Sequence, residues 1–160
     1  MTDTIDTIKA KIVSRSDYLK SAGRNPKLKV VFTNGVFDIL HKGHIELLAR
    51  AADFGDILIV GLNSDQSVKR LKGENRPLQD EESRALVLAS IEFVDYVIRF
   101  TEDTPLELIK SLHPNVLIKG GDYKVEEIVG YDFVKETGGE VYCLEFVKGY
   151  SSTSIIGKIN

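Results

Sequence analysis

The chain has 160 residues, of which 42% are hydrophobic and 28% charged, and its net charge at pH 7 is -3. These values predict one soluble globular domain and argue against a nucleic-acid partner, whose binding surface is usually basic. The polar N-terminus and the short apolar runs predict no signal peptide and no membrane contact. Cys143 is the only cysteine, so no intrachain disulfide can form, and we expect a cytoplasmic protein.

Short apolar runs alternate with amphipathic segments along the chain. Helical spacing over residues 5–22 leads us to interpret residues 1–28 as a leader helix and linker, ahead of a main domain at 29–160. Strands are predicted at 28–32, 57–62, 96–100, 116–119 and 140–146. Helices are predicted at 43–54, 65–71, 81–93, 105–112 and 152–159, with a partly helical stretch at 125–137.

Two local details refine these helices. Thr104 is expected to cap the helix that begins with Pro105, and Leu86, Val87 and Ser90 are expected to face the core from their helix. The alternation as a whole predicts an α/β fold: a Rossmann-like, doubly wound parallel sheet in a single domain, with helices on both faces.

In such sheets, ligands bind beyond the carboxyl ends of the strands, near the point where the strand order reverses. That rule selects four loops of this sequence: 33–44, 63–76, 119–123 and 148–153. The polar stretch 73–80 contains Pro77 and is expected to be a mobile loop.

The loop after the first strand carries a His-x-Gly-His turn. His41 and His44 are three residues apart, so on a helical turn they project from one face. Gly35 and Gly43 allow close approach of the backbone, and the following helix N-terminus favours anions. The turn therefore predicts a phosphate clamp. The alternative is a metal site with Asp38 and the two histidines as ligands.

Two segments show a family resemblance. Residues 35–44, Gly-Val-Phe-Asp-Ile-Leu-His-Lys-Gly-His, resemble the G-x-F-D-x-x-H-x-G-H signature of the cytidylyltransferase-like nucleotidyltransferases. Residues 149–156, Gly-Tyr-Ser-Ser-Thr-Ser-Ile-Ile, resemble that family's second signature, G-I-S-T-T-x-I-I. The resemblance extends from Lys29 to the end of the chain and implies the fold of that family.

Within that family, the sequence looks most like the adenylyltransferases that make ADP-heptose from heptose 1-phosphate for the lipopolysaccharide core. The segments that carry this likeness are 32–38, 63–65, 69–73, 76–77, 102–105 and 119–123. In many bacteria the domain is fused behind a sugar kinase, and this chain looks like the stand-alone form. The resemblance implies ATP and a sugar phosphate as partners, and a homodimer by analogy.

The same resemblance implies the residues of the site. Those expected to act in catalysis are His41, His44, Lys72 and Ser152. Those expected to bind the nucleotide or its acceptor are Thr33, Asn34, Gly35, Phe37, Asp38, Gly43, Asn63, Lys119, Gly121, Asp122, Ser151 and Thr153.

One departure from the family concerns the positive charge of the site. Several relatives carry an Arg-Thr pair where this chain has Phe146-Val147-Lys148, so cations are expected from elsewhere. The candidates are Lys42, Lys69, Lys72 and Lys148. The cations of the flexible loop are expected to close over bound phosphates, joined by Arg84 of the next helix; they are Lys69, Arg70, Lys72 and Arg76. Mg²⁺ is expected to accompany ATP, although no motif names a protein ligand for it, and Asp38 is the one candidate.

The chemistry needs no general base, because a phosphate monoester is already mostly dianionic at neutral pH. Two alternatives to heptose adenylyl transfer stay open on the sequence. One is a cytidylyltransferase acting on glycerol 3-phosphate or a related alcohol phosphate. The other is a non-catalytic module that senses nucleotides.

Overall fold

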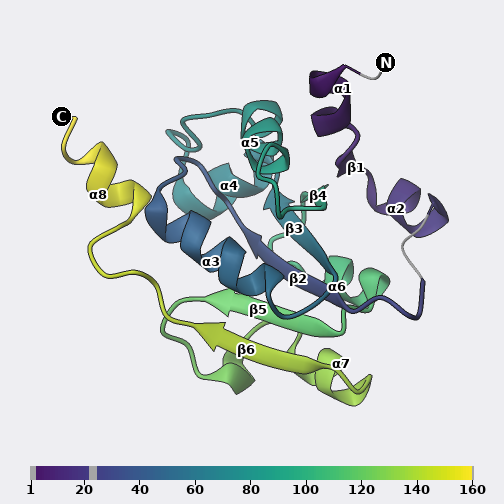
Figure 1. Ribbon diagram of the computed structural model, residues 1–160. Helices are drawn as coiled ribbons and strands as arrows, with labels where there is room; N and C mark the ends of the chain where they lie inside the picture. Colours follow the sequence, from purple (N-terminus) through teal and green to yellow (C-terminus); the bar gives the residue numbers. More distant parts are fainter. Residues whose placement is uncertain (1–2, 22–24, 160) are drawn as a thin grey trace.

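The computed structural model describes residues 3–21 and 25–159. Within these ranges, all neighbouring strands of one six-stranded sheet pair in parallel, in the order β1-β4-β3-β2-β5-β6 (Figure 1). The strands are β1 (Ile12–Val13), β2 (Val30–Gly35), β3 (Ile57–Asn63), β4 (Tyr96–Phe100), β5 (Val116–Gly120) and β6 (Glu140–Leu144). The predicted single-domain, doubly wound parallel sheet is confirmed.

The helices cover both faces of this sheet. They are α1 (Thr4–Lys9), α2 (Arg15–Ser21), α3 (Lys42–Ala52), α4 (Asp65–Lys72), α5 (Glu81–Ala89), α6 (Leu106–Leu112), α7 (Tyr131–Glu136) and α8 (Ser152–Ile156), with a 3-10 turn η1 at Val125–Glu127. Helices α3 and α5 share one core with one face of the sheet, and α2, α6 and α7 share a second core with the other face.

Alternation along the central strands produces the two cores. In β3, Leu58 and Val60 belong to the core under α3 and α5, whereas Ile59 between them belongs to the other core. All three are at most 1% exposed. Each such side chain contributes on the order of 1.5–3 kcal/mol through burial, so the sheet is held firmly from both sides.

The strand order places a binding crevice at the centre of the sheet. From β2 the chain first proceeds to β3 and β4 on one side, and it later returns to β5 on the other. The carboxyl ends of β2 and β5, at Gly35 and Gly120, therefore flank the point where the strand order reverses.

The N-terminal segment differs from the predicted single leader helix. Residues 3–21 form two short helices separated by β1, whose Ile12 and Val13 pair with β4 and extend the sheet. Tyr18 of α2 is 1% exposed and packs edge-on against the Tyr96 ring at 5.0 Å. This segment is therefore part of the folded unit. Residues 1–2 and 22–24 of the predicted leader and linker lie outside the described residues.

Three further details differ from expectation. Thr104 does not cap α6, because Pro105 occupies the N-cap position and no side chain caps this helix. In α5 the buried positions are Arg84, Ala85, Leu88 and Ala89, whereas Val87 and Ser90 are exposed. The strand β2 continues to Gly35, so Thr33 lies in the sheet and not in the loop.

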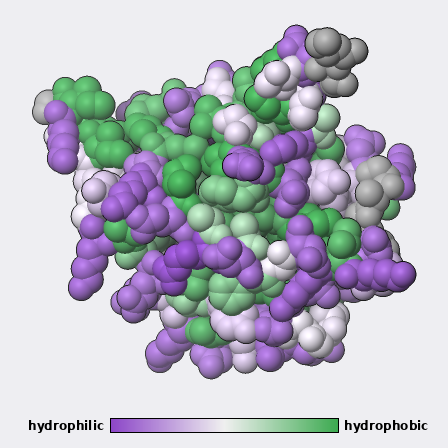
Figure 2. Space-filling model, in the orientation of Figure 1, coloured by the Kyte–Doolittle hydropathy of each residue, from purple (hydrophilic) through white to green (hydrophobic). Residues whose placement is uncertain are grey.

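The C-terminal helix α8 stands apart from the two cores. None of its residues is buried, and Figure 2 shows apolar side chains gathered around this end of the molecule. No helix in the described ranges has the length and apolar character needed to cross a membrane.

Candidate active site

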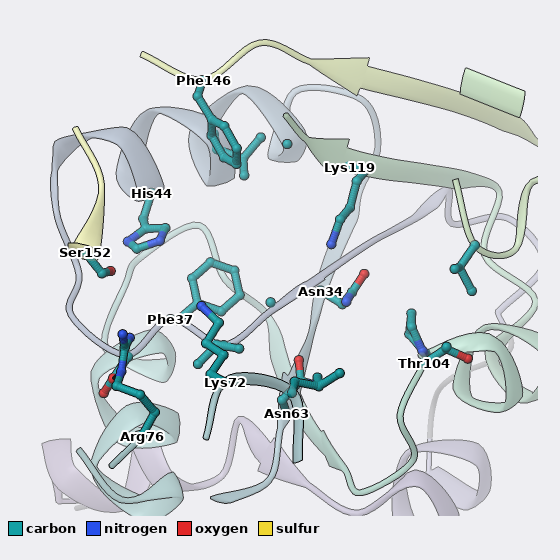
Figure 3. A pocket seen from close by; sticks show the side chains of 18 of the residues that line it. Asn34, Phe37, His44, Asn63, Lys72, Arg76, Thr104, Lys119, Phe146 and Ser152 are labelled. Carbon is teal, nitrogen blue, oxygen red and sulfur yellow. Dashed lines mark hydrogen bonds and ion pairs between the residues drawn. The ribbon is translucent and has the colours of Figure 1, made fainter. Parts of the chain in front are cut away.

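A cavity of about 420 Å³ opens at the carboxyl ends of the central strands (Figure 3). Strand ends, the His-x-Gly-His turn, α4 with its following loop, the β4–α6 loop and the C-terminal segment all contribute to its lining. The predicted site residues that line it are Asn34, Gly35, Phe37, Asp38, His44, Asn63, Lys72, Lys119 and Ser152. Nine of the predicted site residues thus lie around a single cavity.

The two histidines of the turn lie against each other. Their rings stack with centroids 3.9 Å apart, and His44 lines the cavity whereas His41 does not. His41 is the N-cap of α3, and its Nδ1 accepts a hydrogen bond from the Gly43 N–H at 3.1 Å. Because Nδ1 is an acceptor, the proton of neutral His41 resides on Nε2, which remains available as a donor.

The turn leaves little room for a side chain at Gly43. A Cβ at this position would lie 3.0 Å from Cε1 and Nδ1 of the His41 ring. Phe37 precedes the turn with a φ of 49°, an uncommon value for a non-glycine residue, and its ring lies 5.2 Å from that of His44. The turn thus fixes the orientation of both imidazoles.

Burial lowers the pKa of both histidines. The pKa of His44 falls to about 4, first because the ring is desolvated and then because His41 and Lys72 add positive charge nearby. Desolvation also lowers the pKa of His41. His44 is therefore neutral at pH 7 without a ligand, and an anion beside it would favour its protonated form.

Asp38 has a different role from the expected ligand contact. Its side chain is 1% exposed, and its carboxylate accepts hydrogen bonds from Arg76 Nε at 2.8 Å and from the N–H groups of Leu78 and Gln79. Burial acts to raise the pKa of Asp38, but these donors outweigh burial and lower it. These hydrogen bonds connect the middle of the 73–80 loop to Asp38, just before the His-x-Gly-His turn.

This engagement also bears on metal binding. With three donors on its two oxygens, the Asp38 carboxylate does not fit the role of a Mg²⁺ ligand. Among residues 3–21 and 25–159, no group of three or more His, Cys, Asp or Glu side chains could hold a metal ion. The alternative metal site at Asp38, His41 and His44 is therefore not supported, and Mg²⁺ would have to arrive bound to a substrate's phosphates.

Three cations line the same cavity as His44. Arg76 contributes a guanidinium whose Nη2 is buried and has no hydrogen-bond partner within the described part of the chain. The pKa of Lys72 is lowered by partial desolvation and then by the charge of Arg76. Desolvation is also the main cause that lowers the pKa of Lys119. Arg76 is paired with Asp38, whereas Lys72 and Lys119 form no salt bridge with the residues that the structure describes.

The start of α8 presents one side chain to the cavity. Ser151 is the N-cap of α8, with its hydroxyl accepting from the Ser154 N–H, so it serves the helix. Ser152 lines the cavity and donates to the Ile39 carbonyl at 3.2 Å, which ties α8 to the His-x-Gly-His turn. Thr153 is exposed and does not line the cavity.

Four other predicted residues also lie outside the lining. Thr33 is fully buried in β2, Gly43 is buried at the start of α3, and Asp122 is exposed. Gly121 has a φ of 144°, and a Cβ there would lie 2.4 Å from the Tyr123 ring. Gly121 therefore positions Tyr123, which does line the cavity.

The cations that the sequence suggested for the site divide into two groups. Lys72 and Arg76 reach the cavity, but Lys42, Lys69, Arg70 and Lys148 do not line it. Arg70 instead pairs with Asp103 at 2.8 Å. Arg84 is 1% exposed and donates to the carbonyls of Val36, Asn63 and Gln79 and to Asp65, so it is a structural cross-link and not part of a lid.

Several lining residues were not among the predicted site residues. Leu47 and Phe146 form an apolar wall, and Thr104, Pro105, Tyr123 and Val129 line the end near Lys119. Of these, only Tyr123 lies in a loop selected by the strand-end rule, and Thr104 and Pro105 lie in a segment that carries the family likeness. Leu47, Val129 and Phe146 gave no signal, because apolar side chains at such positions have no distinctive sequence spacing.

The fold and the cavity together define an α/β protein with a cleft at the carboxyl edge of its parallel sheet, lined by one histidine and three cations. The sequence model described as Cytidylyltransferase-like matches residues 32–158. The chain therefore belongs to the cytidylyltransferase-like family.

Individual relatives agree with this membership. The chain is 54% identical over 149 residues to "Bifunctional protein HldE" of Campylobacter curvus, and the match covers 93% of this chain and 31% of that protein. It is 59% identical over 133 residues to the protein of that name from Campylobacter concisus, covering 83% of this chain and 27% of that protein. The chain thus spans about a third of the length of these curated relatives or less.

A solved structure shows the same fold. The lipopolysaccharide core biosynthesis protein of Thermoplasma volcanium is 31% identical to this chain and superposes with a TM-score of 0.62. The match covers 78% of this chain and 99% of that one.

Proposed function

We propose that this chain transfers the AMP part of ATP to a heptose 1-phosphate, giving ADP-heptose and pyrophosphate for the lipopolysaccharide core. The observation that carries the proposal is the convergence of His44, Lys72 and Arg76 on one cavity at the reversal point of the sheet. The relatives described above supply the acceptor class, because one is a lipopolysaccharide core biosynthesis protein. The proposal places the reaction in the cytoplasm, where ATP is available.

The nucleophile is an oxygen of the sugar phosphate. It forms a bond to the α-phosphorus of ATP while the bond from that phosphorus to the bridging oxygen breaks, and pyrophosphate leaves with the electron pair. The attacking phosphate has lost its protons at neutral pH, so it needs no base. Consistently, the two carboxylates that line the cavity, Asp38 and Asp103, are both paired with arginines.

The residues act by holding charge in place. Negative charge grows on the α-phosphate and on the leaving pyrophosphate, and donors fixed beforehand stabilise it without reorganisation. His44 and the free Nη2 of Arg76 would donate to these oxygens, with Lys72 as a further cation. His41, stacked on His44, orients that ring and offers its Nε2 proton when the triphosphate reaches the turn.

The nucleoside needs an apolar surface, and the cavity has one at Leu47 and Phe146. Phe146 is 53% exposed, so its ring is open to a planar base. Gly120 belongs to the same wall, since a Cβ there would lie 2.6 Å from Leu47 and 2.8 Å from Phe146. Mg²⁺ enters with ATP as part of the substrate and shields the phosphates before they meet the cations of the site.

A panel of nucleotides and acceptors with pyrophosphate detection tests this function. ATP with heptose 1-phosphate should give the highest kcat/KM, and CTP with glycerol 3-phosphate should give little product. A preference for CTP with glycerol 3-phosphate would replace the substrate assignment by that of a cytidylyltransferase. Binding of ATP without pyrophosphate from any acceptor would indicate a nucleotide sensor instead.

A further inference from the structure

A second, smaller cavity of about 200 Å³ adjoins the main one at the end of the site away from His44. The side cavity adds Glu127 and Ile128, whereas His44 and Lys72 line only the larger cavity. The two linings have five residues in common: Asn34, Pro105, Lys119, Tyr123 and Val129. Figure 3 shows the same separation: His44 and Ser152 lie at one end of the view, and Asn34, Lys119 and Thr104 lie toward the other. The side cavity is therefore a branch of the site that begins at Lys119.

The side cavity has a mixed lining. Ile128 and Val129 provide an apolar surface, and the ring of Tyr123, 52% exposed, stands beside it. Glu127, in the 3-10 turn η1, adds a carboxylate that has no salt bridge or hydrogen bond to its side chain in the described ranges. The Asn34 amide and the Lys119 ammonium are likewise without a side-chain hydrogen bond there, and Figure 3 shows the Lys119 nitrogen directed toward Asn34.

This combination suits a polyhydroxylated ring better than a flat base. A sugar offers one face of C–H groups, which packs on an aromatic ring, and an edge of hydroxyl groups, which donate to a carboxylate and exchange hydrogen bonds with an amide. A neutral purine has no comparable row of hydroxyl donors for Glu127. The apolar wall at Leu47 and Phe146, described above, lies outside the side cavity and remains available to the base.

The geometry of phosphoryl transfer leads to the same division. The attacking and leaving oxygens lie roughly in line through the α-phosphorus. If pyrophosphate leaves toward His44 and the start of α8, the acceptor must enter from the opposite end, which is where Lys119 and the side cavity lie. Lys119, which lines both cavities, is then placed to hold the acceptor's phosphate at their junction.

We infer that the side cavity is the acceptor subsite: it holds the ring of a sugar 1-phosphate, with Glu127 and Asn34 on its hydroxyl groups, Tyr123 on its apolar face and Lys119 on its phosphate. This assignment rests on the proposed nucleotidyl transfer for the direction of attack. It makes Glu127 and Tyr123 specificity-determining residues for the sugar.

The test measures the affinities of both substrates separately, by calorimetry, in the wild type and in Glu127→Gln. The variant should bind heptose 1-phosphate about tenfold more weakly, because a hydrogen bond to a charged group becomes one to a neutral group. Its affinity for ATP should not change. Glu126→Gln is the matched control, since Glu126 is the exposed neighbour and does not line the side cavity. Phe146→Ala should show the reverse pattern, with weaker ATP and unchanged sugar phosphate.

Pyrophosphate release, measured in parallel, separates the two proposals. Glu127-dependent binding of heptose 1-phosphate without pyrophosphate would retain the subsite and reject the transfer. If Glu127→Gln binds the sugar phosphate as the wild type does and still releases pyrophosphate, the subsite alone is rejected. A loss of ATP affinity in Glu127→Gln would also reject the subsite alone. A wild type that binds no sugar phosphate would overturn both.

Discussion

The anchor formed by Asp38 gives the sharpest test of the structure. In Asp38→Asn the side chain keeps its shape but loses its charge, and one oxygen becomes an NH₂ group. The wild-type oxygens accept from Arg76 Nε and from the N–H groups of Leu78 and Gln79. An amide cannot accept all of these, so the NH₂ group faces a donor and the guanidinium loses its counter-charge.

The expected cost follows from burial. The side chains of Asp38 and Arg76 are 1% and 18% exposed, and removing one partner of a buried ion pair typically destabilises a protein by about 3–5 kcal/mol. Glu107→Gln is the control, because Glu107 pairs with Lys110 on the surface, where such a pair contributes about 0–1 kcal/mol. Urea unfolding at pH 7 measures both changes.

The pH dependence of stability gives a second test of the Asp38→Asn variant. The hydrogen bonds lower the pKa of Asp38 below its ordinary value of 3.8. The stability it contributes is thus complete above about pH 3.8 and is lost as the pH falls through the lower pKa of the folded protein. The difference in the free energy of unfolding between wild type and Asp38→Asn should therefore shrink as the pH falls below about 3.8. An Asp38→Asn protein as stable as the wild type at pH 7 would refute this reasoning.

Three other variants probe the site and its support. In the wild type, the free energy of unfolding should fall as the pH drops from about 6.5 to 4, because the unfolded chain protonates His44 in this range whereas the folded protein does not. His44→Gln should weaken this pH dependence. The same pH dependence in both proteins would contradict the reasoning. Lys72→Met should lower turnover about a hundredfold or more with little change in unfolding, whereas Lys69→Met, on the exposed side of α4, should behave as wild type in the same assay. Arg84→Met should destabilise the protein by several kcal/mol, because each buried carbonyl left unpaired costs on the order of 1–3 kcal/mol. A melting temperature within about two degrees of the wild type would contradict the role of Arg84 as a cross-link.

The strands and the His-x-Gly-His turn could be predicted because their signals are local. The first four residues of β3 (Ile57–Asn63) are all apolar and β-branched or leucine, as in strands buried on both faces. The paired histidines have a fixed spacing that determines their geometry once a helix begins beside them. For these segments, neighbours in the sequence are sufficient to define the structure.

The errors arose where a contact joins distant residues. The two-residue strand Ile12–Val13 is too short for any periodicity, and it is held by pairing with β4. Arg84 looked like a solvent-facing cation, but its guanidinium bonds to carbonyls that only the fold brings together. For Asp38, the motif suggested a ligand contact, which stays a prediction; the sequence did not indicate its hydrogen bonds to residues about 40 positions further along the chain.

The most direct measurement of the central claim follows an oxygen atom through the reaction. Heptose 1-phosphate carrying ¹⁸O in the non-bridging oxygens of its phosphate is incubated with ATP and Mg²⁺, and the products are analysed by mass spectrometry. Attack of that phosphate on the α-phosphorus predicts ADP-heptose that retains all the label, together with one unlabelled pyrophosphate for each ADP-heptose formed. Labelled pyrophosphate, inorganic phosphate in place of pyrophosphate, or no ADP-heptose would contradict nucleotidyl transfer at this site.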